Sequence, residues 1–219
     1  MKLPEGFINN ISELSALSGG DALQGLAAAL TETEPAIGIR RNRRKTTGWA
    51  NPSLAEVEWA PEAGATLTGE RPRFTLDPAL HQGRYYVQDP SSMLTAVVVE
   101  HITEKLGRDD LIYVDVCAAP GGKTTAAIDA LGDDALVIAN EHDHKRVGAL
   151  IENLAKWGAP NVVITENDGR KIGVLGAIAD VVAADVPCSG EGMMRKDSDA
   201  VEQWSQRLVA ECAELQREI

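Results

Sequence analysis

The strongest constraint on the fold is an alternation of short apolar runs and helical segments that begins at Leu111. These runs and segments, in chain order, are residues 111–116, 124–131, 136–139, 144–157, 162–165, 180–184 and 200–219. Short apolar runs are typical of strands buried on both faces, and helices between them indicate βαβ units. We therefore predict an α/β fold built on a parallel, doubly wound sheet.

Residues 1–88 have a different pattern, which predicts a small N-terminal α+β domain. Helical periodicity within residues 3–30, interrupted at Gly19-Gly20, predicts two short helices. Short strands are expected around Trp49, Val57, Trp59 and Tyr85–Val87. The domain boundary is expected near Gln88, which leaves residues 89–219 for the second domain.

The second domain is expected to open with a helix. Asp89, Ser91 and Ser92 offer capping side chains ahead of an apolar stripe, and Gly107 provides a stop.

The composition fits a globular chain, because 44% of its 219 residues are hydrophobic and can form a substantial core. No apolar stretch is long enough to cross a bilayer, and no signal-peptide pattern follows Met1, so we expect a cytoplasmic location. The three cysteines, Cys117, Cys188 and Cys212, lack zinc-ligand spacing and are too few for a disulfide framework. We therefore expect neither a metal site nor disulfides.

A net charge of -12 argues against a surface that binds nucleic acid over its whole extent, because phosphate contacts depend on Lys and Arg. One basic cluster departs from this balance and consists of Arg40, Arg41, Arg43, Arg44 and Lys45. The cluster is compatible with a contact to RNA, and equally with a turn whose charges pair with nearby acids. The sequence leaves both interpretations open.

The segment from Asp115 to Thr124, between the first predicted strand and its helix, combines small residues with paired glycines. Such a turn lets the backbone approach a ligand beside the N–H groups of a helix N-terminus. Gly122-Lys123-Thr124 also matches the end of a phosphate-binding P-loop, and Asp185 matches its Mg²⁺-binding aspartate. Cys117 stands where a P-loop requires glycine, which argues against a triphosphate.

Two acids favour a nucleoside ligand at the same edge of the sheet. Glu141 ends the second predicted strand, where a carboxylate accepts hydrogen bonds from ribose hydroxyls. Asp168 follows the third strand and is placed for an adenine amino group. The alternative for each acid is simple capping of the next helix.

The fourth predicted strand leads into Asp185-Val186-Pro187-Cys188, which places a cysteine beside a carboxylate near the predicted ligand loop. A thiol in that position suits covalent chemistry, whereas a buried structural cysteine is the commoner alternative.

Two segments together resemble the Nol/Nop/Sun family of RNA cytosine-C5 methyltransferases. They are residues 115–124, Asp-Val-Cys-Ala-Ala-Pro-Gly-Gly-Lys-Thr, and residues 185–192, Asp-Val-Pro-Cys-Ser-Gly-Glu-Gly. Residues 74–78, 85–88 and 193–197 further resemble the bacterial, RsmF-like branch that modifies ribosomal RNA. The likeness covers nearly the whole chain and implies a Rossmann-like class I methyltransferase sheet.

The resemblance also implies a cofactor, S-adenosylmethionine, and RNA, expected to be ribosomal RNA, as the partner. Glu141 would hold the ribose, Asp168 the adenine, and Asp185 would lie near the methyl group. The loop that wraps the cofactor would consist of Cys117, Ala118, Ala119, Pro120, Gly121, Gly122 and Lys123.

The reaction that the resemblance implies is covalent. In this family a thiolate adds to C6 of a cytosine swung out of its stack, C5 is methylated, and the C5 proton and the thiolate then leave. Lys123 and Asp185 would orient and polarise the cytosine, and Cys188 would assist release.

One part of the family pattern is missing, because the nucleophile is a second cysteine in a later Thr-Cys motif that no residue here supplies. Cys212 is no replacement, since its spacing from Trp204 and Leu208 places it on the apolar face of a helix, where a buried structural role is expected. We therefore expect a sheet truncated after its fourth strand, with a bare edge that favours self-association.

Three alternatives stay open. In the first, Cys188 itself attacks C6, as the Pro-Cys cysteine does in DNA cytosine-C5 methyltransferases. In the second, the chain is a catalytically inactive fragment that binds RNA and cofactor, with the RNA-binding activity in residues 1–88. The third alternative is a P-loop NTPase.

Overall fold

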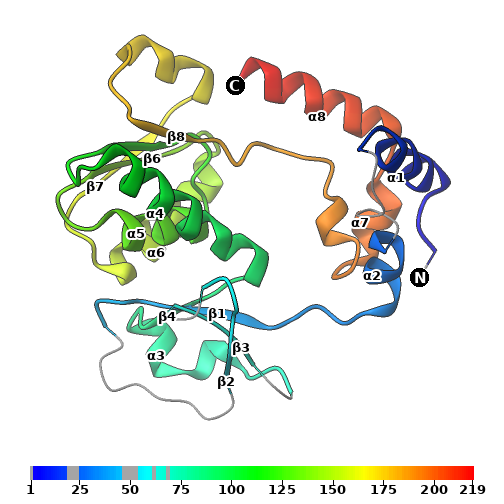
Figure 1. Cartoon of the computed structure of the whole chain (residues 1–219), viewed down its shortest axis with the longest axis horizontal. Coiled ribbons are helices and arrows are strands. Elements are labelled where there is room, and N and C mark those ends of the chain that lie inside the picture. The colour runs from blue at the N-terminus through cyan, green and yellow to red at the C-terminus, as the bar shows by residue number, and fades with distance from the viewer. Residues whose placement is uncertain (1, 19–24, 46–53, 61–62, 68–69) are drawn as a thin grey trace. The chain divides into compact units, whose positions relative to one another are not determined.

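The computed structural model describes residues 2–18, 25–45, 54–60, 63–67 and 70–219. Contacts group the chain into two compact units (Figure 1). One unit is formed by residues 36–185, and the other by residues 1–35 together with residues 186–219.

The larger sheet of the first unit is parallel and has the strand order β7-β6-β5-β8. Its strands are β5 (Ile112–Asp115), β6 (Leu136–Glu141), β7 (Val162–Glu166) and β8 (Val181–Ala183). The chain moves outward from β5 to β7 and then returns to the other side of β5. This reversal confirms the predicted Rossmann-like α/β fold, in which ligands bind at the carboxyl ends of strands beside the switch point.

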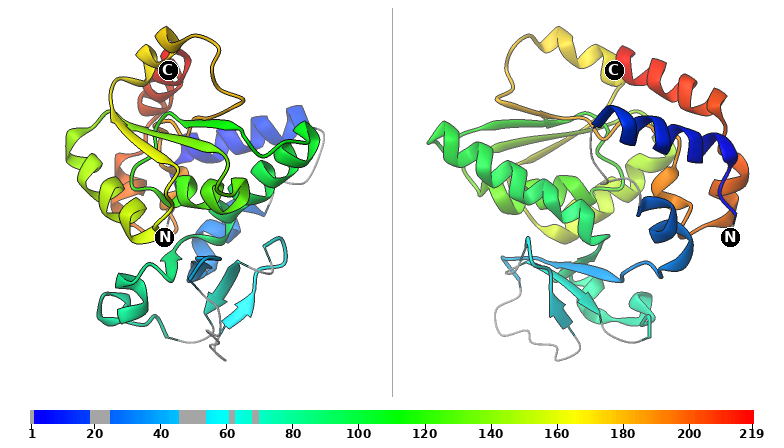
Figure 2. Two further views of the ribbon diagram at one scale, coloured as in Figure 1. Left: turned by 90° about the vertical axis from the view of Figure 1, so that its left-hand side faces the viewer. Right: turned by 45° about the vertical axis from the view of Figure 1, so that its right-hand side comes forward.

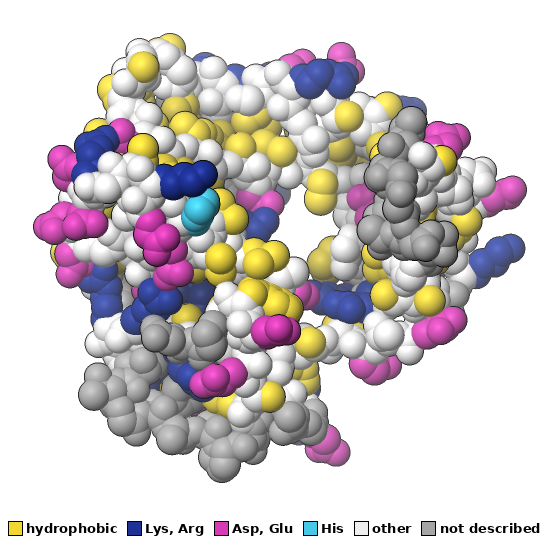
Figure 3. All heavy atoms as spheres, viewed as in Figure 1, with side chains coloured by type: hydrophobic (Ala, Val, Ile, Leu, Met, Phe, Trp, Pro, Cys, Tyr) yellow, Lys and Arg dark blue, Asp and Glu magenta, His cyan; other side chains and the backbone are white. Residues whose placement is uncertain are grey.

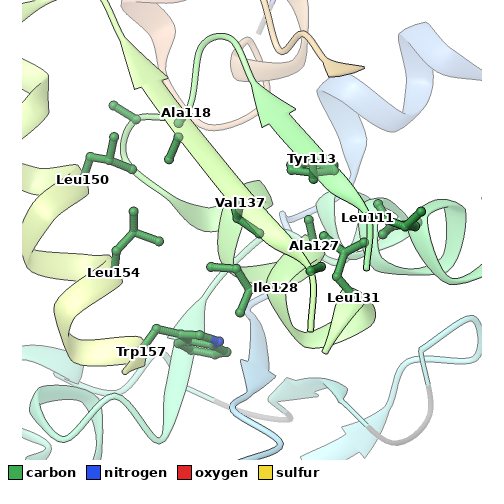
Figure 4. Packing of buried hydrophobic residues seen from close by; sticks show 14 residues of the cluster. Leu111, Tyr113, Ala118, Ala127, Ile128, Leu131, Val137, Leu150, Leu154 and Trp157 are labelled. Carbon is green, nitrogen blue, oxygen red and sulfur yellow. The ribbon is translucent and has the colours of Figure 1, made fainter. Parts of the chain in front are cut away.

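Three helices cover one face of the larger sheet (Figure 2). They are α4 (Leu94–Leu106), α5 (Gly122–Leu131) and α6 (His144–Trp157). Leu150, Leu154 and Trp157 of α6 lie with Ile128 of α5 against Val137 of the sheet (Figure 4). The crossover from β7 to β8 carries only a 3-10 segment, η4 (Gly169–Leu175).

The start and the end of α4 agree with the capping residues and the glycine stop predicted from the sequence. The Asp89 side chain accepts a hydrogen bond from Ser91 N at the start of the 3-10 turn η3 (Pro90–Met93), which leads directly into α4. Gly107 ends α4 in the left-handed conformation.

A smaller antiparallel sheet belongs to the same unit and has the strand order β2-β3-β1-β4. Its strands are β1 (Gly38–Arg41), β2 (Leu54–Glu56), β3 (Gly64–Leu67) and β4 (Tyr85–Val87). The 3-10 turn η2 (Phe74–Leu76) and the short helix α3 (Pro78–His81) precede β4. The prediction of strand at Val57 and Trp59 was wrong, because both follow β2. Trp49 lies outside the described residues.

The second unit contains only helices and turns in its described part. They are α1 (Glu5–Ser18), α2 (Leu26–Glu32), η5 (Glu191–Met193), α7 (Ser198–Gln203) and α8 (Gln206–Glu218). Its core joins the two ends of the sequence, since the rings of Phe7 and Trp204 meet edge to face at 5.9 Å. The break predicted at Gly19-Gly20 lies outside the described residues.

The single helix predicted for residues 200–219 is divided. Trp204 leaves the helical conformation to enter the core, and the Ser205 side chain accepts a hydrogen bond from Leu208 N to start α8. Cys212, predicted to be buried, is only half-buried in α8.

The expected boundary near Gln88 does not coincide with the division into units, because both neighbours of Gln88 belong to the unit of residues 36–185. The independent folding of residues 1–88 stays a prediction. Within the described residues, no helix is long and apolar enough to cross a membrane.

Candidate cofactor and catalytic site

The loop after β5 lies at the carboxyl edge of the larger sheet, beside the switch point. Ala118 and Ala119 are buried, and Ala118 N donates to Asn140 O of β6 over 2.7 Å. The Ala119-Pro120 peptide is cis. Gly121 then takes a φ of +105°, which strongly favours glycine, and α5 begins at the next residue. The loop thus turns tightly and presents its backbone at the start of a helix.

Cys117 is half-buried at the start of this loop. Burial raises the pKa of its thiol, and the carboxylates of Glu141 and Asp115 raise it further. Cys117 is therefore a protonated thiol at neutral pH, which disfavours it as a nucleophile.

Glu141, at the end of β6, is almost fully buried and holds the loop. Its Oε2 accepts from Ala119 N over 3.2 Å, and its Oε1 accepts from Asp143 N over 2.9 Å. Arg146 Nη1 lies 3.4 Å from Oε2. Each carboxylate oxygen accepts more than one hydrogen bond, so Glu141 retains capacity for a ligand hydroxyl.

Asp168 follows β7 at the same edge and caps η4. Its side chain accepts from Arg170 N over 3.1 Å and pairs with Arg170 Nη2 at 2.7 Å. The hydrogen bond from the Arg170 side chain is the largest cause that lowers the pKa of Asp168 to about 2. The side chain is thus a fixed carboxylate, and capping and ligand binding are both compatible with its position.

Lys123 and Asp185 meet across the switch point. Lys123 stands in the first turn of α5, Asp185 follows β8, and the Lys123 Nζ to Asp185 Oδ1 distance is 2.5 Å. Both side chains are partly exposed, at 39% and 56%. The structure therefore brings together two of the three predicted catalytic residues, as a donor and acceptor pair open to solvent.

Cys188 is exposed and belongs to the unit that contains residues 186–219, whereas Lys123 and Asp185 belong to the other unit. Its catalytic role stays a prediction. No group of side chains suited to a metal ion occurs among the described residues.

Comparison with known proteins places the chain in a family. The family model for 16S rRNA methyltransferase RsmB/F matches residues 104–219, more than half of the chain. The chain belongs to the RsmB/F family. This membership confirms the resemblance seen in the sequence.

Proteins that match this chain are considerably longer. Ribosomal RNA small subunit methyltransferase F of Pectobacterium atrosepticum is 36% identical over 175 residues, which cover 78% of this chain and 35% of that protein. The protein of the same name from Escherichia coli O157:H7 is 32% identical over 232 residues, covering 99% and 46%. The crystal structure of PH0851 shares the fold, with a TM-score of 0.77, 23% identity, and coverage of 95% and 47%. The chain thus spans less than half the length of these proteins.

Two residues of the site were missed at the level of sequence. Asn140 is buried in β6, and its Nδ2 donates to Val116 O over 3.0 Å and to Asn167 O over 2.9 Å. It therefore ties the loop after β5 to the loop after β7. The signal was a polar side chain within an apolar run, directly before Glu141.

The second missed residue is Asp115, the last residue of β5. It is buried, and Thr124 Oγ1 donates to its Oδ2 over 2.7 Å. Burial raises the pKa of Asp115 to about 6 despite that hydrogen bond. A backbone hydrogen bond from Cys117 also lowers this pKa, without offsetting the effect of burial.

The basic cluster is largely used inside its own unit. Arg40 is buried against Asp129, Arg43 pairs with Glu100, and Arg44 pairs with Asp133. Lys45 Nζ donates to backbone carbonyls of Gln82 and Lys156.

Basic and acidic side chains are also interspersed on the face drawn in Figure 3. Of the two interpretations, the structure favours internal ion pairing over a free RNA-binding surface.

Proposed function

We propose that this chain forms the cofactor-binding part of an S-adenosylmethionine-dependent rRNA cytosine-C5 methyltransferase. One observation carries the proposal: the loop at residues 117–123, Glu141, Asp168 and the Lys123–Asp185 pair converge at one edge of the parallel sheet. Membership in the RsmB/F family supports ribosomal RNA as the substrate.

The residues present fit S-adenosylmethionine. The loop offers backbone beside a helix start, and Glu141 and Asp168 offer carboxylates for a ribose and an adenine. Gly121, at a φ of +105°, carries no side chain in the turn, so the backbone there is open to a ligand. When bound, S-adenosylmethionine supplies an electrophilic methyl group.

The Lys123–Asp185 pair suits a cytosine ring. Cytosine carries an exocyclic amino donor and a ring carbonyl acceptor, and the pair offers a carboxylate acceptor beside an ammonium donor. An ammonium close to the ring carbonyl also stabilises the negative charge that a thiolate delivers to the ring when it adds to C6. We therefore assign the orientation and polarisation of the base to this pair.

The thiolate chemistry requires a cysteine that reaches C6. The sulfur–C6 bond forms first, C5 becomes nucleophilic, and the later loss of the C5 proton returns electrons to the ring as the sulfur–C6 bond breaks. Cys188, exposed and three residues after Asp185, is our candidate for assisting this release.

Trapping with 5-fluorocytosine RNA tests whether Cys188 attacks the base itself. Fluorine at C5 cannot leave as a proton does, so an attacking cysteine stays bonded to the RNA. If Cys188 is the nucleophile, incubation with S-adenosylmethionine and denaturing electrophoresis will show an adduct that disappears in Cys188→Ala and persists in Cys212→Ala. No adduct at all, or an adduct that persists in Cys188→Ala, would reject Cys188 as the nucleophile. Persistence in Cys188→Ala is the result expected if Cys188 assists release.

The cofactor proposal is tested by calorimetric titration with S-adenosylmethionine. We expect Glu141→Ala and Asp168→Ala each to weaken binding about tenfold or more, because each removes hydrogen bonds to a charged acceptor. Glu152→Ala is the matched control, since Glu152 is an exposed carboxylate of α6 that pairs with Lys156. Equal affinities in all four proteins, each shown to be folded by its melting curve, would contradict the site.

The alternative of an inactive binding fragment is separated by a second measurement on the same proteins. Transfer of a labelled methyl group to ribosomal RNA supports the methyltransferase. Cofactor binding with no transfer to any RNA supports the binding fragment.

A further inference from the structure

Arg40 connects the small sheet to the start of α5. This side chain of β1 is 1% exposed, and its guanidinium reaches three groups of α5. Nη1 pairs with Asp129 Oδ2 at 2.6 Å, and Nη2 donates to Thr125 Oγ1 over 2.5 Å and to Gly122 O over 3.4 Å. Two of these three acceptors lie in the first turn of the helix that begins at the loop.

A hydrogen-bond relay continues from Arg40 into the loop. Thr125 Oγ1, which accepts from Arg40, itself donates to Gly121 O over 2.8 Å. Gly121 is the residue with φ of +105° on which the turn depends. Gly121 O also accepts from Thr125 N over 2.8 Å, and the Thr125 hydroxyl lies 3.1 Å from Gly122 O as well. The hydroxyl that Arg40 contacts thus adds a second hydrogen bond to the carbonyl of the loop's key glycine.

The surroundings of Arg40 make this geometry rigid. Gln88 Oε1 accepts from Arg40 Nε over 3.0 Å, and the guanidinium lies 4.4 Å from the ring centre of Trp157. Tyr86 of β4 packs so closely on the helix start that a Cβ at Gly122 would lie 3.2 Å from its ring. A planar guanidinium with fixed donors holds its acceptors in one arrangement, which an ammonium does not.

The energetic cost of this arrangement argues that it has a use. Burial lowers the pKa of Arg40 to about 10, and the Asp129 carboxylate opposes that change. A buried ion pair adds little net stability compared with an apolar pair of the same shape, but it specifies geometry. The geometry specified here is that of the loop.

We propose that Arg40 is a positioning residue for the loop at residues 117–123, so that the small sheet sets the affinity for S-adenosylmethionine through the Arg40–Thr125–Gly121 relay. The inference rests on the proposed function, because it takes this loop to be the cofactor site.

The test compares two relay variants with one control in the whole chain. Thr125→Val keeps the shape of a buried side chain and removes the relay hydroxyl, and Arg40→Met removes the guanidinium. Asn42→Ala is the control. Asn42 follows β1 and is buried, as Arg40 is. Its Nδ2 donates to Gly83 O, in the turn before β4, and to Trp157 O, at the C-terminal end of α6. It weakens the same attachment of the small sheet without touching the loop.

Titration with S-adenosylmethionine should show the dissociation constant raised about fivefold in Thr125→Val and about tenfold or more in Arg40→Met. The double variant should bind no more weakly than Arg40→Met alone, because both changes break one relay. Amide exchange in the peptide that covers residues 117–123 should accelerate in both relay variants. Asn42→Ala should melt at a lower temperature and bind as the wild type does.

Wild-type affinity in Thr125→Val would overturn the inference, and so would an equal loss of affinity in Asn42→Ala and Arg40→Met. Thr125→Val decides alone if Arg40→Met does not fold. Failure of the folded wild type to bind S-adenosylmethionine would overturn the proposed function, and the inference with it.

Discussion

Asp115 shows how a single residue of the site is governed by its surroundings. The carboxylate ends a buried strand, where removal from water disfavours its charged form, and hydrogen bonds from the Thr124 hydroxyl and the Cys117 backbone do not compensate for that loss. A buried acid of this kind makes the stability of the fold depend on pH.

Asp115→Asn tests that dependence. The pKa of Asp115 is about 6 in the folded chain, against an ordinary value of 3.8. Between these values the folded chain keeps a proton that the unfolded chain has released, so the free energy of unfolding falls as pH rises through the window. The asparagine does not titrate, so the free energy of unfolding of the variant relative to the wild type should rise by up to about 3 kcal/mol between about pH 4 and about pH 7.5.

Urea unfolding at the two pH values measures this difference. A difference between variant and wild type that stays constant with pH would show that Asp115 is not perturbed in the folded chain.

The sequence identified those site residues whose partners are close in the sequence or whose place follows from the strand pattern. Glu141 and Asp185 were found because each lies at the end of an apolar run, and parallel strands bring such ends to one edge. Arg40 was interpreted only as one member of the basic cluster, because its partner Asp129 lies 89 positions away and no local pattern reveals that pairing. Asp115 was quoted as part of a motif, but its unusual pKa depends on burial that only the packed sheet provides.

At the scale of elements, the strands of the larger sheet and helix α6 were the most predictable, because apolar runs and caps agree there. The α6 helix begins at His144 as expected, with the Asp143 side chain accepting from Lys145 N, and ends before Gly158. The short strands of the small sheet were less predictable, since each is stabilised by partners distant in the sequence rather than by its own composition. The division of α7 from α8 likewise follows from the burial of Trp204, a tertiary effect.

The turn before β4 offers a test of how closely the small sheet packs on α6. Gly83 has a φ of +64°, and a Cβ there would lie 2.0 Å from Lys156 O. Gly107 has nearly the same φ, +65°, with no atom within 4 Å of a Cβ. Gly107→Ala should lower the free energy of unfolding by about 1 kcal/mol through its backbone conformation alone. Gly83→Ala should lower it by about 3 kcal/mol or more, because backbone must also move.

Chemical denaturation of both glycine variants measures the two losses. Similar losses would mean that the turn is not in contact with α6.

At the scale of the whole molecule, the larger sheet has one face covered by α4, α5 and α6 and an apolar row on the other. The strand register places Val163, Ile138, Val114 and Val182 side by side in that row. Val163 and Val182, at the two ends of the row, are 48% and 61% exposed, whereas Val114 in its middle is buried. Within the described residues, β7 pairs with β6 alone and β8 pairs with β5 alone, so both edge strands keep free backbone groups on one side. Exposed apolar rows and free edges both promote association.

We therefore expect the purified chain to self-associate with increasing concentration. Val182→Lys should reduce this association, because a lysine in an edge strand opposes both strand pairing and apolar contact. Val174→Lys is the control, since Val174 is more exposed, at 84%, but lies in η4 outside the row. Sedimentation velocity over a range of concentrations should show a lower average mass for Val182→Lys than for the wild type and no change for Val174→Lys.

An equal effect of both lysines would assign the association to net charge, because each adds the same positive charge to a chain of net charge -12. A wild type that stays monomeric throughout would show that the apolar row and the edge of β8 do not drive association.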